Sequence, residues 1–332
     1  MEKGSRIFVA GHTGLAGSAL VRLLQNRGFN NLLLKTSSEL DLTDQASVRS
    51  FFRAEKPEYV FMAAGKGGGI VANIKYPAEF IYTNLQIQDN LIHSAREWGV
   101  KKLLFIACSC IYPRDCPQPI SEESLLAGPV EPTSEPFAIS KIAGIKMCQA
   151  YNRQYGTNFI SVVPATLYGP NDNFDLETSH FLSAFIVKFH QAKKEQTPKV
   201  VLWGSGAPER ELLYVDDFAD AALFLMENYN GSEHINVGTG NGVTIRQAAE
   251  VVKEVVGFRG DVVFDKTKPD GAPRKVLDSN RMRGLGWTAR TPLRQGLRKT
   301  YEWYMNADWL SRKAAASLSA IRGISSGGIN GD

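Results

Sequence analysis

The sequence predicts an α/β fold, a doubly wound parallel sheet joined to a smaller mixed α/β domain toward the C-terminus. Two observations lead to this prediction. Short apolar runs alternate with segments of helical periodicity through the first half of the chain, and a glycine-rich turn separates the first run from the first helical segment. The apolar runs are continuous rather than alternating, which is typical of parallel strands whose two faces are covered by helices.

The elements of the first half follow one another in a regular order. Strands are expected where short apolar runs occur, at residues 7–10, 32–34, 59–63, 103–107 and 159–163. Helices are expected between them, at residues 15–27, 47–55, 78–98 and 136–155. Gly28 follows the first helix and is expected to end it. Pro136 stands in the first turn of the last helix, where its missing N–H costs no hydrogen bond.

The second half is less regular and predicts a smaller domain from which the chain returns once to the main sheet. Its expected strands are residues 200–203, 235–237 and 262–264, and its expected helices are 217–228 and 244–256. We therefore expect a dinucleotide-binding domain of residues 1–170 with a return segment at about 210–240. Residues 171–209 and 241–312 would form a substrate domain, and the Ala-, Ser- and Gly-rich residues 313–332 a flexible tail.

The composition argues against several classes of function. The 332 residues are 43% hydrophobic and 22% charged, as in ordinary globular proteins, and their net charge is +4. They contain no cluster of Lys and Arg of the kind that follows a nucleic-acid backbone, so no nucleic-acid partner is expected. We find no apolar targeting segment and no apolar run of the roughly 18 residues that a membrane span needs, so we expect a cytoplasmic protein without membrane contact.

The cysteines and histidines give no sign of a metal site. Cys108, Cys110 and Cys116 lie close together, but no pair of His or Cys answers them downstream at zinc-ligand spacing. We therefore expect no metal, and we expect the four cysteines to be reduced thiols.

The glycine-rich turn is the first candidate site. Glycines let the backbone approach a pyrophosphate, and a helix N-terminus offers free N–H groups and the positive end of its dipole. Here the glycines follow a strand and open a helix, so the pattern predicts a Rossmann domain that binds a nicotinamide dinucleotide. The turn reads Gly11-His12-Thr13-Gly14-Leu15-Ala16-Gly17.

The end of the second strand bears on the choice between NAD and NADP. An acidic residue there would bind the ribose 2′-hydroxyl and repel a 2′-phosphate, but Lys35-Thr36-Ser37 stand there instead. NADP(H) is therefore favoured, with NAD(H) as the alternative, since Lys35 is equally explained as a solvated surface lysine. Further cofactor contacts are expected at Asp41, Leu42, Ala63, Ala64, Ile106, Ala107, Cys108, Ser109, Lys141, Pro164, Ala165, Thr166, Leu167 and His180.

Several segments along the chain match those of one known family. On these segments the sequence resembles the GDP-L-fucose synthases, bifunctional epimerase–reductases of the extended short-chain dehydrogenase/reductase superfamily. The resemblance covers roughly residues 5–305. Besides Val9-Ala10-Gly11-His12 with Gly14 and Gly17, the segments are 69–73 (GIVAN), 109–113 (SCIYP), 141–146 (KIAGIK), 151–156 (YNRQYG), 167–170 (LYGP), 203–206 (WGSG) and 268–275 (KPDGAPRK).

The resemblance implies a reaction in two stages on GDP-4-keto-6-deoxy-D-mannose. C3 and C5 are epimerised through an enolate, and the C4 ketone is then reduced by NADPH. The family's acid/base pair falls on Cys110 and His180, two side-chain types that can be tuned to exchange a proton near neutral pH. Each residue alone would be read as a structural thiol or a surface imidazole, but both lie inside matching motifs.

The resemblance also implies where the GDP-sugar binds. Cations neutralise a pyrophosphate, an indole face can stack, and a carboxylate can accept hydrogen bonds from guanine. Lys188 stands where the family usually has arginine, so a point charge replaces a bidentate fork. The implied substrate contacts are Lys188, Trp203, Arg210, Asp270 and Arg274.

A homodimer is a further implication of the resemblance. The family pairs two helices from each subunit, which correspond here to residues 78–98 and 136–155. We expect Ile139, Ile142 and Ile145 to supply apolar surface for this contact. The alternative is that all three pack inside one subunit.

The reductase centre departs from the family pattern. The superfamily uses a Ser or Thr and a Tyr-x-x-x-Lys motif, in which the tyrosine hydroxyl gives its proton to the ketone oxygen. Here Phe137 occupies the tyrosine position, Lys141 is kept, and Cys108 occupies the Ser/Thr position. Because a phenyl ring has no hydroxyl and a thiol is a weak donor, we expect C4 reduction to be impaired or absent, with water, Ser109 or Cys108 as the remaining donor. Thr13 and Ser37 also replace the arginines that read the 2′-phosphate.

Three explanations of this departure remain open. The protein has given up ketone reduction and kept epimerisation, or Phe137 is an engineered replacement in a fully competent epimerase-reductase, which leaves Cys108 unexplained. The third is a catalytically dead nucleotide-binding subunit. Retention of Cys110, His180 and Lys141 argues against that last explanation.

Overall fold

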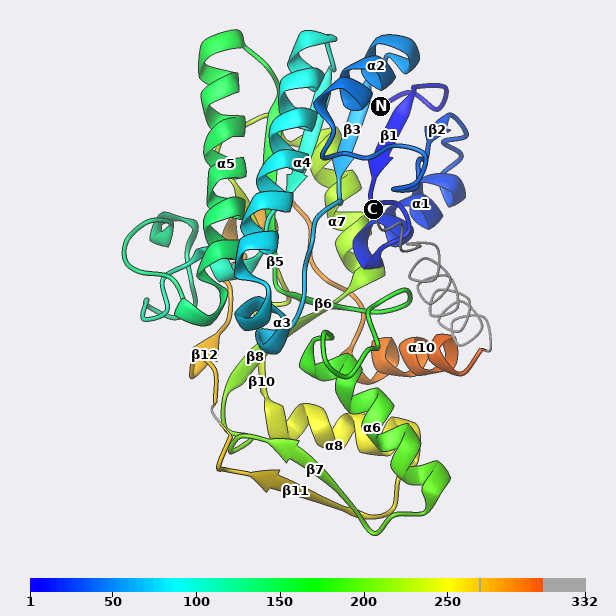
Figure 1. Ribbon diagram of the computed structural model, residues 1–332, viewed down its shortest axis with the longest axis vertical. Helices are drawn as coiled ribbons and strands as arrows, with labels where there is room; N and C mark the ends of the chain where they lie inside the picture. Colours follow the sequence, from blue (N-terminus) through cyan, green and yellow to red (C-terminus); the bar gives the residue numbers. More distant parts are fainter. Residues whose placement is uncertain (269, 307–332) are drawn as a thin grey trace, which may run out of the picture.

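The computed structural model describes residues 1–268 and 270–306 and is built around a six-stranded parallel sheet (Figure 1). The strand order is β2-β1-β3-β4-β5-β9, and every neighbouring pair runs parallel. The order changes direction between β1 and β3, and such a switch point is where open α/β sheets bind ligands. The strands are β1 (Ile7–Ala10), β2 (Leu32–Leu33), β3 (Tyr59–Met62), β4 (Lys102–Ile106), β5 (Phe159–Pro164) and β9 (Ile235–Val237).

Helices cover both faces of this sheet. α1 (Leu15–Asn26) and α7 (Val215–Asn228) pack together on one face, and α2 (Gln45–Glu55), α4 (Pro77–Glu97) and α5 (Glu135–Tyr155) pack on the other. As a result β1 and β4 are buried along their whole length, which accounts for their continuous apolar sequences. The predicted doubly wound α/β fold is confirmed.

The second half of the chain adds two smaller sheets at the far end of the molecule (Figure 1). In one of them β8 lies between β10 and β12 and also pairs with β6, and in the other β7 pairs with β11. Helices α6 (Phe181–Glu195), α8 (Ile245–Val256) and α10 (Leu293–Met305) contribute to a second hydrophobic core there. The strands are β6 (Thr166–Tyr168), β7 (Lys199–Trp203), β8 (Glu209–Tyr214), β10 (Gly242–Thr244), β11 (Asp261–Asp265) and β12 (Arg274–Lys275).

Short helices shape the connections. Among the described residues these are α3 (Ile70–Lys75), α9 (Asn280–Gly284) and the 3₁₀ turns η1 (Ser109–Ile111), η2 (Glu122–Ser124) and η3 (Pro132–Ser134). η1 lies directly beyond the end of β4 and packs against α5, while η3 packs against α3.

One expectation about the helices is wrong. Ile142 and Ile145 of α5 are 7% and 0% exposed and belong to the main core, so they offer no surface to a second subunit. Ile139, nearly one turn before Ile142, is 42% exposed. The domain boundaries stay predictions, and the expected tail at 313–332 lies outside the described residues.

Within the described part of the chain, no helix has both the length and the apolar character needed to cross a bilayer.

Candidate active site

The glycine turn packs closely against the end of β3. Gly11 has a φ of +80°, which favours glycine, and a Cβ there would lie 2.6 Å from the backbone nitrogen of Ala64. A Cβ at Gly17 would collide with the carbonyl oxygen of Gly11. Side chains at these two positions would therefore displace the backbone around the switch point.

The N-terminus of α1 is open toward this turn. Gly14 is the N-cap and brings no side-chain cap, and the first turn of the helix contains no acidic residue. The N–H of Gly14 is used by the carbonyl of Gly11, 3.1 Å away, but the next amides have no intrahelical partner. An anionic group such as a pyrophosphate fits this arrangement of donors and helix dipole.

The carboxyl ends of the central strands meet at the same edge of the sheet. Ala63 donates its N–H to Ala10 across 3.0 Å, and Ala107 donates to Val162 across 2.9 Å. Ala165 makes the corresponding bond, of 2.8 Å, to Val237 at the end of β9. The structure thus lines up the predicted cofactor positions at the ends of β3, β4 and β5 along one edge.

A carboxylate that the sequence argument overlooked lies beyond β2. Glu39 accepts hydrogen bonds from the N–H and the hydroxyl of Thr36 over 2.8 and 2.7 Å. These bonds, with smaller contributions from the charges of Lys35 and His12, hold the pKa of Glu39 below its usual value. Its only signal in the sequence is its position two residues after Ser37. The carboxylate of Asp41, one of the predicted cofactor contacts, accepts hydrogen bonds from the N–H and hydroxyl of Thr43.

Residues 107–112, the β4 exit loop, carry the two cysteines of the predicted site. Cys108 is extended, η1 begins at Ser109, and the sulfur atoms of Cys108 and Cys110 are joined as a disulfide. The expectation of reduced thiols is wrong for this pair and confirmed for Cys116 and Cys148, which are free. The reason is local: the extended residue and the tight turn place the two Cα atoms 5.5 Å apart, within the usual range for a disulfide.

Helix α5 brings Lys141 to this loop. Its ammonium lies 3.4 Å from the carbonyl of Ile106 and 5.2 Å from the ring centre of Phe105. Burial lowers the pKa of Lys141 to about 8. Phe137, one turn earlier, places its ring centre 5.8 Å from the same ammonium and packs edge-on against Phe80. The place expected for a hydroxyl is therefore filled by an aromatic hydrocarbon.

A glycine-rich loop, residues 65–69, packs against both α5 and the segment that carries His180. A Cβ on Gly65 would lie 3.2 Å from the Lys141 ammonium, and one on Gly68 would lie 3.2 Å from the Phe80 ring. Gly69 donates its N–H to the Thr178 carbonyl over 2.9 Å. His180 is the exposed N-cap of α6. Both sides of the predicted site thus contact one loop, although no hydrogen bond joins His180 to Cys110 among the described residues.

Asp172 is the carboxylate next to His180. Burial raises the pKa of Asp172, while a hydrogen bond from the Ser183 hydroxyl and the charge of His180 act against this. The sequence argument overlooked this residue.

The predicted substrate residues gather on the smaller sheets. Arg274 of β12 lies beside Glu209 of β8 and pairs with its carboxylate at 2.7 Å. Arg210, the next residue of β8, donates to the carbonyls of Glu209 and Ala272, both at 2.7 Å. Asp270 accepts from the N–H and the hydroxyl of Ser205, which joins its loop to the end of β7.

Trp203 and Lys188 lie on the neighbouring strand and helix. The Trp203 side chain is 56% exposed at the end of β7, with the Lys268 ammonium 5.4 Å from its ring centre. Lys188 of α6 donates to the Val201 carbonyl over 3.3 Å, and burial lowers its pKa. No signal in the sequence singled out Lys275, which lies opposite Arg210 across β12 and β8. Burial and the charge of Arg210 lower the pKa of Lys275 to about 8.

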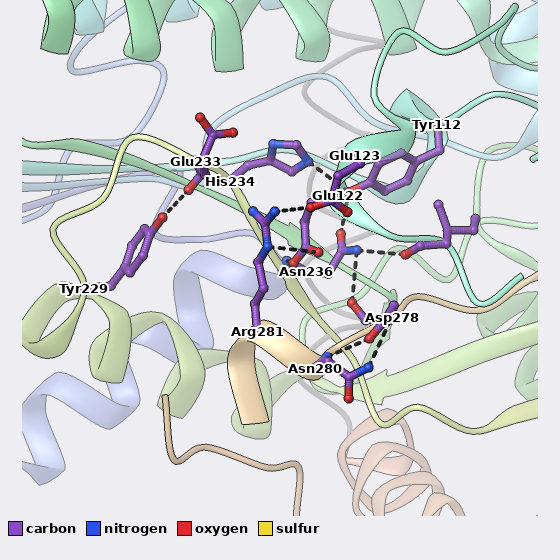
Figure 2. Close-up of polar contacts among 11 residues, drawn as sticks. Tyr112, Glu122, Glu123, Tyr229, Glu233, His234, Asn236, Asp278, Asn280 and Arg281 are labelled. Atoms are coloured by element: carbon purple, nitrogen blue, oxygen red, sulfur yellow. Dashed lines mark hydrogen bonds and ion pairs between the residues drawn. The ribbon is translucent and has the colours of Figure 1, made fainter. Parts of the chain in front are cut away.

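A buried polar network holds the end of the β4 exit loop (Figure 2). Tyr112, two residues after Cys110, donates from its hydroxyl to Asn236 Oδ1 over 2.5 Å and lies 3.0 Å from His234 Nε2. Asn236 donates its backbone N–H to Glu122 over 3.0 Å, and Glu122 pairs with Arg281 at 3.6 Å. The loop is thereby fixed to β9 and to the segment that begins α9.

The same contacts keep His234 neutral. The single Tyr112 hydroxyl proton goes to Asn236, so the hydroxyl accepts from His234 Nε2–H. His234 Nδ1 is buried and has no hydrogen-bond partner among the described residues, so a proton there would be unpaired. Burial accordingly lowers the pKa of His234 to about 4.

One cavity of about 290 Å³ lies apart from all of these residues, between β8, β10 and residues 289–293. No residue predicted for the site lines it, so the candidate site rests on the chemistry at the sheet edge rather than on this cavity.

Known proteins resemble the chain along most of its length. A family model described as the NAD dependent epimerase/dehydratase family matches residues 7–238. The chain is 60% identical over 305 residues to a putative GDP-L-fucose synthase 2 of Arabidopsis thaliana, covering 92% of this chain and 93% of that protein. The chain belongs to the GDP-L-fucose synthase family. The GDP-L-fucose synthase of Escherichia coli K12 is 50% identical over 309 residues, covering 90% and 96%.

Solved structures agree with this family and with its Rossmann fold. A GDP-mannoheptose C4 reductase from Campylobacter jejuni with NADP bound is 42% identical to the chain, with a TM-score of 0.84 and coverage of 92% of this chain and 99% of that one. The protein is therefore an enzyme of a family of NAD(P)-dependent epimerase-reductases in the extended short-chain dehydrogenase/reductase superfamily.

Proposed function

We propose that this member of the GDP-L-fucose synthase family epimerises C3 and C5 of a GDP-4-keto-6-deoxy-hexose, and that its C4 reductase step is impaired or absent. One observation carries the proposal. On α5 the lysine of the reductase motif is kept beside the β4 exit loop, but the Phe137 ring stands 5.8 Å from its ammonium, where a proton-donating hydroxyl is needed. Acid catalysis by a positioned side chain is typically worth about 10²–10⁴-fold, and its loss should slow reduction by about that factor.

The cofactor we propose is NADP(H), with NAD(H) as the alternative. The glycine turn fits a pyrophosphate because Gly11 and Gly17 allow the close packing of the turn, and because α1 brings neither a side-chain cap nor an acidic residue to its N-terminus. When bound, the cofactor supplies or accepts a hydride at the substrate C4. The NADP in the C. jejuni relative supports the choice of NADP(H). We assign Lys141, at the same sheet edge, to the nicotinamide ribose.

Epimerisation needs a proton carrier on each face of the sugar and a donor to the C4 oxygen, because the enolate charge rests on that oxygen. We assign the two carriers to Cys110, in its thiol form, and His180. In the absence of a hydroxyl at position 137, Ser109 or a bound water would serve the oxygen. The Gly65–Gly69 loop supports this assignment, since it contacts both Lys141 and the Thr178 backbone.

Lys188, Trp203, Arg210, Asp270 and Arg274 are proposed to bind the GDP moiety. Arg210 shares one face of β8 and β12 with Lys275, which suits two cations facing one pyrophosphate. Arg274 shares the other face with Glu209. The half-exposed indole of Trp203 suits stacking, and the Asp270 carboxylate suits the guanine edge.

A second candidate is a complete epimerase-reductase, which the names of the A. thaliana and E. coli relatives favour. It would require water or Ser109 to replace the missing hydroxyl in ketone reduction as well. Measuring NADPH oxidation beside proton exchange separates this candidate from the first.

We also propose a cytoplasmic homodimer. Tyr82 of α4 and Ile139 and Tyr155 of α5 are exposed on the two helices that the family pairs, and they replace the buried Ile142 and Ile145 as contact residues. Sedimentation that gives a monomer at micromolar concentration would refute the dimer.

The experiment for the epimerase is proton exchange in D₂O. The protein, kept reduced with dithiothreitol and supplied with NADP⁺, is mixed with GDP-4-keto-6-deoxy-mannose, and the deuterium content of the sugar is followed by mass spectrometry. We expect uptake at C3 and C5, loss of uptake in Cys110→Ala and His180→Ala, and normal uptake in the matched control Cys116→Ser. Absence of uptake by the reduced wild-type protein would contradict the proposal and favour a dead subunit.

A further inference from the structure

Two of the four cysteines, Cys108 and Cys110, are bonded to each other, and Cys110 is one of the two predicted proton carriers. Cys108 ends the extended segment after β4, Cys110 lies in the η1 turn, and their sulfur atoms are bonded. Their Cα atoms are 5.5 Å apart, so the backbone already has the separation that a disulfide needs. Only one residue, Ser109, lies between them, so the bond closes within the β4 exit loop.

The other cysteines are poor competitors for an oxidant. Cys148 is completely buried in the main core, and burial raises the pKa of its thiol to about 12. Cys116 is half-buried, as Cys108 and Cys110 are, but burial raises the pKa of its thiol, so it has less of the reactive thiolate at neutral pH than an ordinary cysteine. Cys108 and Cys110 are only half-buried, at the sheet edge where the substrate is proposed to bind.

We propose that Cys108 and Cys110 form a reversible oxidation site whose reactant is a hydroperoxide, and that its oxidised form holds the enzyme inactive. The thiolate of one cysteine attacks the outer peroxide oxygen, breaks the O–O bond, releases the alcohol or water and becomes a sulfenic acid. The second thiol attacks that sulfur and displaces water. Two thiols and one ROOH thus give one disulfide, one ROH and one H₂O, and a dithiol reductant reverses the change.

The consequence for catalysis rests on the proposed function. In the disulfide, Cys110 has no S–H to give and no thiolate to receive a proton, so one face of the sugar loses its proton carrier. The contacts that hold the rest of the site do not involve either sulfur: Lys141 binds the Ile106 carbonyl, and Tyr112 is held by Asn236. We therefore expect oxidation to stop proton exchange while dinucleotide binding persists.

The test uses the full chain, with hydrogen peroxide as the probe. The protein is oxidised, unfolded, alkylated with iodoacetamide and digested with trypsin, which releases residues 103–114 as one peptide carrying both cysteines. After oxidation we expect this peptide to lack both alkyl groups and two hydrogen atoms, and dithiothreitol to restore both labels. Deuterium exchange into the substrate should fall in proportion to the oxidised fraction and recover on reduction.

Two variants sharpen the result. Cys108→Ser cannot form the bond, so its peptide should never show the loss of two hydrogen atoms, whereas Cys116→Ser should respond as the wild-type protein does. Full alkylation of both cysteines after peroxide treatment, or a disulfide that involves Cys116 instead, would refute the proposal that Cys108 and Cys110 form the oxidation site. If the disulfide forms and deuterium exchange into the substrate continues, the claim that oxidation inactivates the enzyme is wrong. A protein that forms the bond reversibly but catalyses no exchange even when reduced would support the site and contradict the proposed function.

Discussion

At the scale of single residues, the choice of cofactor depends on a few charges beyond β2. Lys35 favours a 2′-phosphate, but Glu39 lies near it and near His12, and hydrogen bonds from Thr36 lower the pKa of that carboxylate. The sequence argument weighed only residues 35–37 and missed the acid, because a side chain that turns back to an earlier backbone amide is not visible in a linear motif.

We predict that Glu39→Gln raises the affinity for NADPH over that for NADH by about two- to fivefold, the range typical of one exposed charge. The amide keeps the shape of the side chain and removes its repulsion of a phosphate. Lys35→Ala should shift the ratio in the opposite direction. Dissociation constants measured through the fluorescence of the two reduced cofactors check this, and an unchanged ratio in both variants would show that the phosphate does not sit here.

The buried Lys141 leads to a prediction about how NADPH binding depends on pH. Burial lowers its pKa to about 8, so the ammonium that we expect to bind the ribose is present below that pH and lost above it. The dissociation constant of NADPH should therefore rise as the pH increases through about 8. Lys141→Arg stays protonated throughout and should remove this dependence. A wild-type dissociation constant that stays constant on both sides of pH 8 would refute the role.

At the scale of elements, sequence reasoning succeeded where apolar runs alternate with helices. The four helices expected in the first half, which are α1, α2, α4 and α5, and the strands of the main sheet lie within a few residues of their expected positions. It missed α3, α6, α9, α10, β6, β8, β10 and β12. Half of β8 is charged (Glu209, Arg210, Glu211), and β12 has only two residues, so their pairing is decided by tertiary contacts rather than by periodicity.

The β4 exit loop shows the same limit at the site. Its motif was found from the sequence, but its anchor was not, because Tyr112 and Asn236 are 124 residues apart. We predict that Tyr112→Phe destabilises the protein by about 1–3 kcal/mol, since Asn236 Oδ1 would lose its donor while buried. Chemical denaturation measures this. A Tyr112→Phe variant that is as stable as the wild-type protein would show that the anchor contributes nothing.

At the scale of the whole molecule, the buried polar network around His234 makes the free energy of unfolding depend on pH. Burial lowers the pKa of His234 from 6.5 to about 4, so the unfolded chain binds a proton between these values that the folded chain does not. Stability from this group is complete above pH 6.5 and is lost as the pH falls toward 4, by on the order of 3 kcal/mol. Burial raises the pKa values of Glu122 and Glu211, so the folded chain holds more protons on these carboxyls, and they favour the folded state as the pH falls.

The contribution of the histidine is therefore isolated by a variant. His234→Gln can still donate to the Tyr112 hydroxyl but does not titrate, so its denaturation midpoint should fall less than that of the wild-type protein between pH 6.5 and 4. Parallel pH profiles of the two proteins would contradict the neutral assignment of His234.

The central claim concerns the whole active site: proton exchange is kept while hydride transfer to C4 is slowed. The most direct test measures both in one reduced sample, by following deuterium uptake at C3 and C5 together with the loss of NADPH absorbance. We predict that NADPH oxidation lags exchange by about 10²–10⁴-fold and speeds up in Phe137→Tyr. Oxidation by the wild-type protein that keeps pace with exchange would contradict the claim and establish a complete epimerase-reductase.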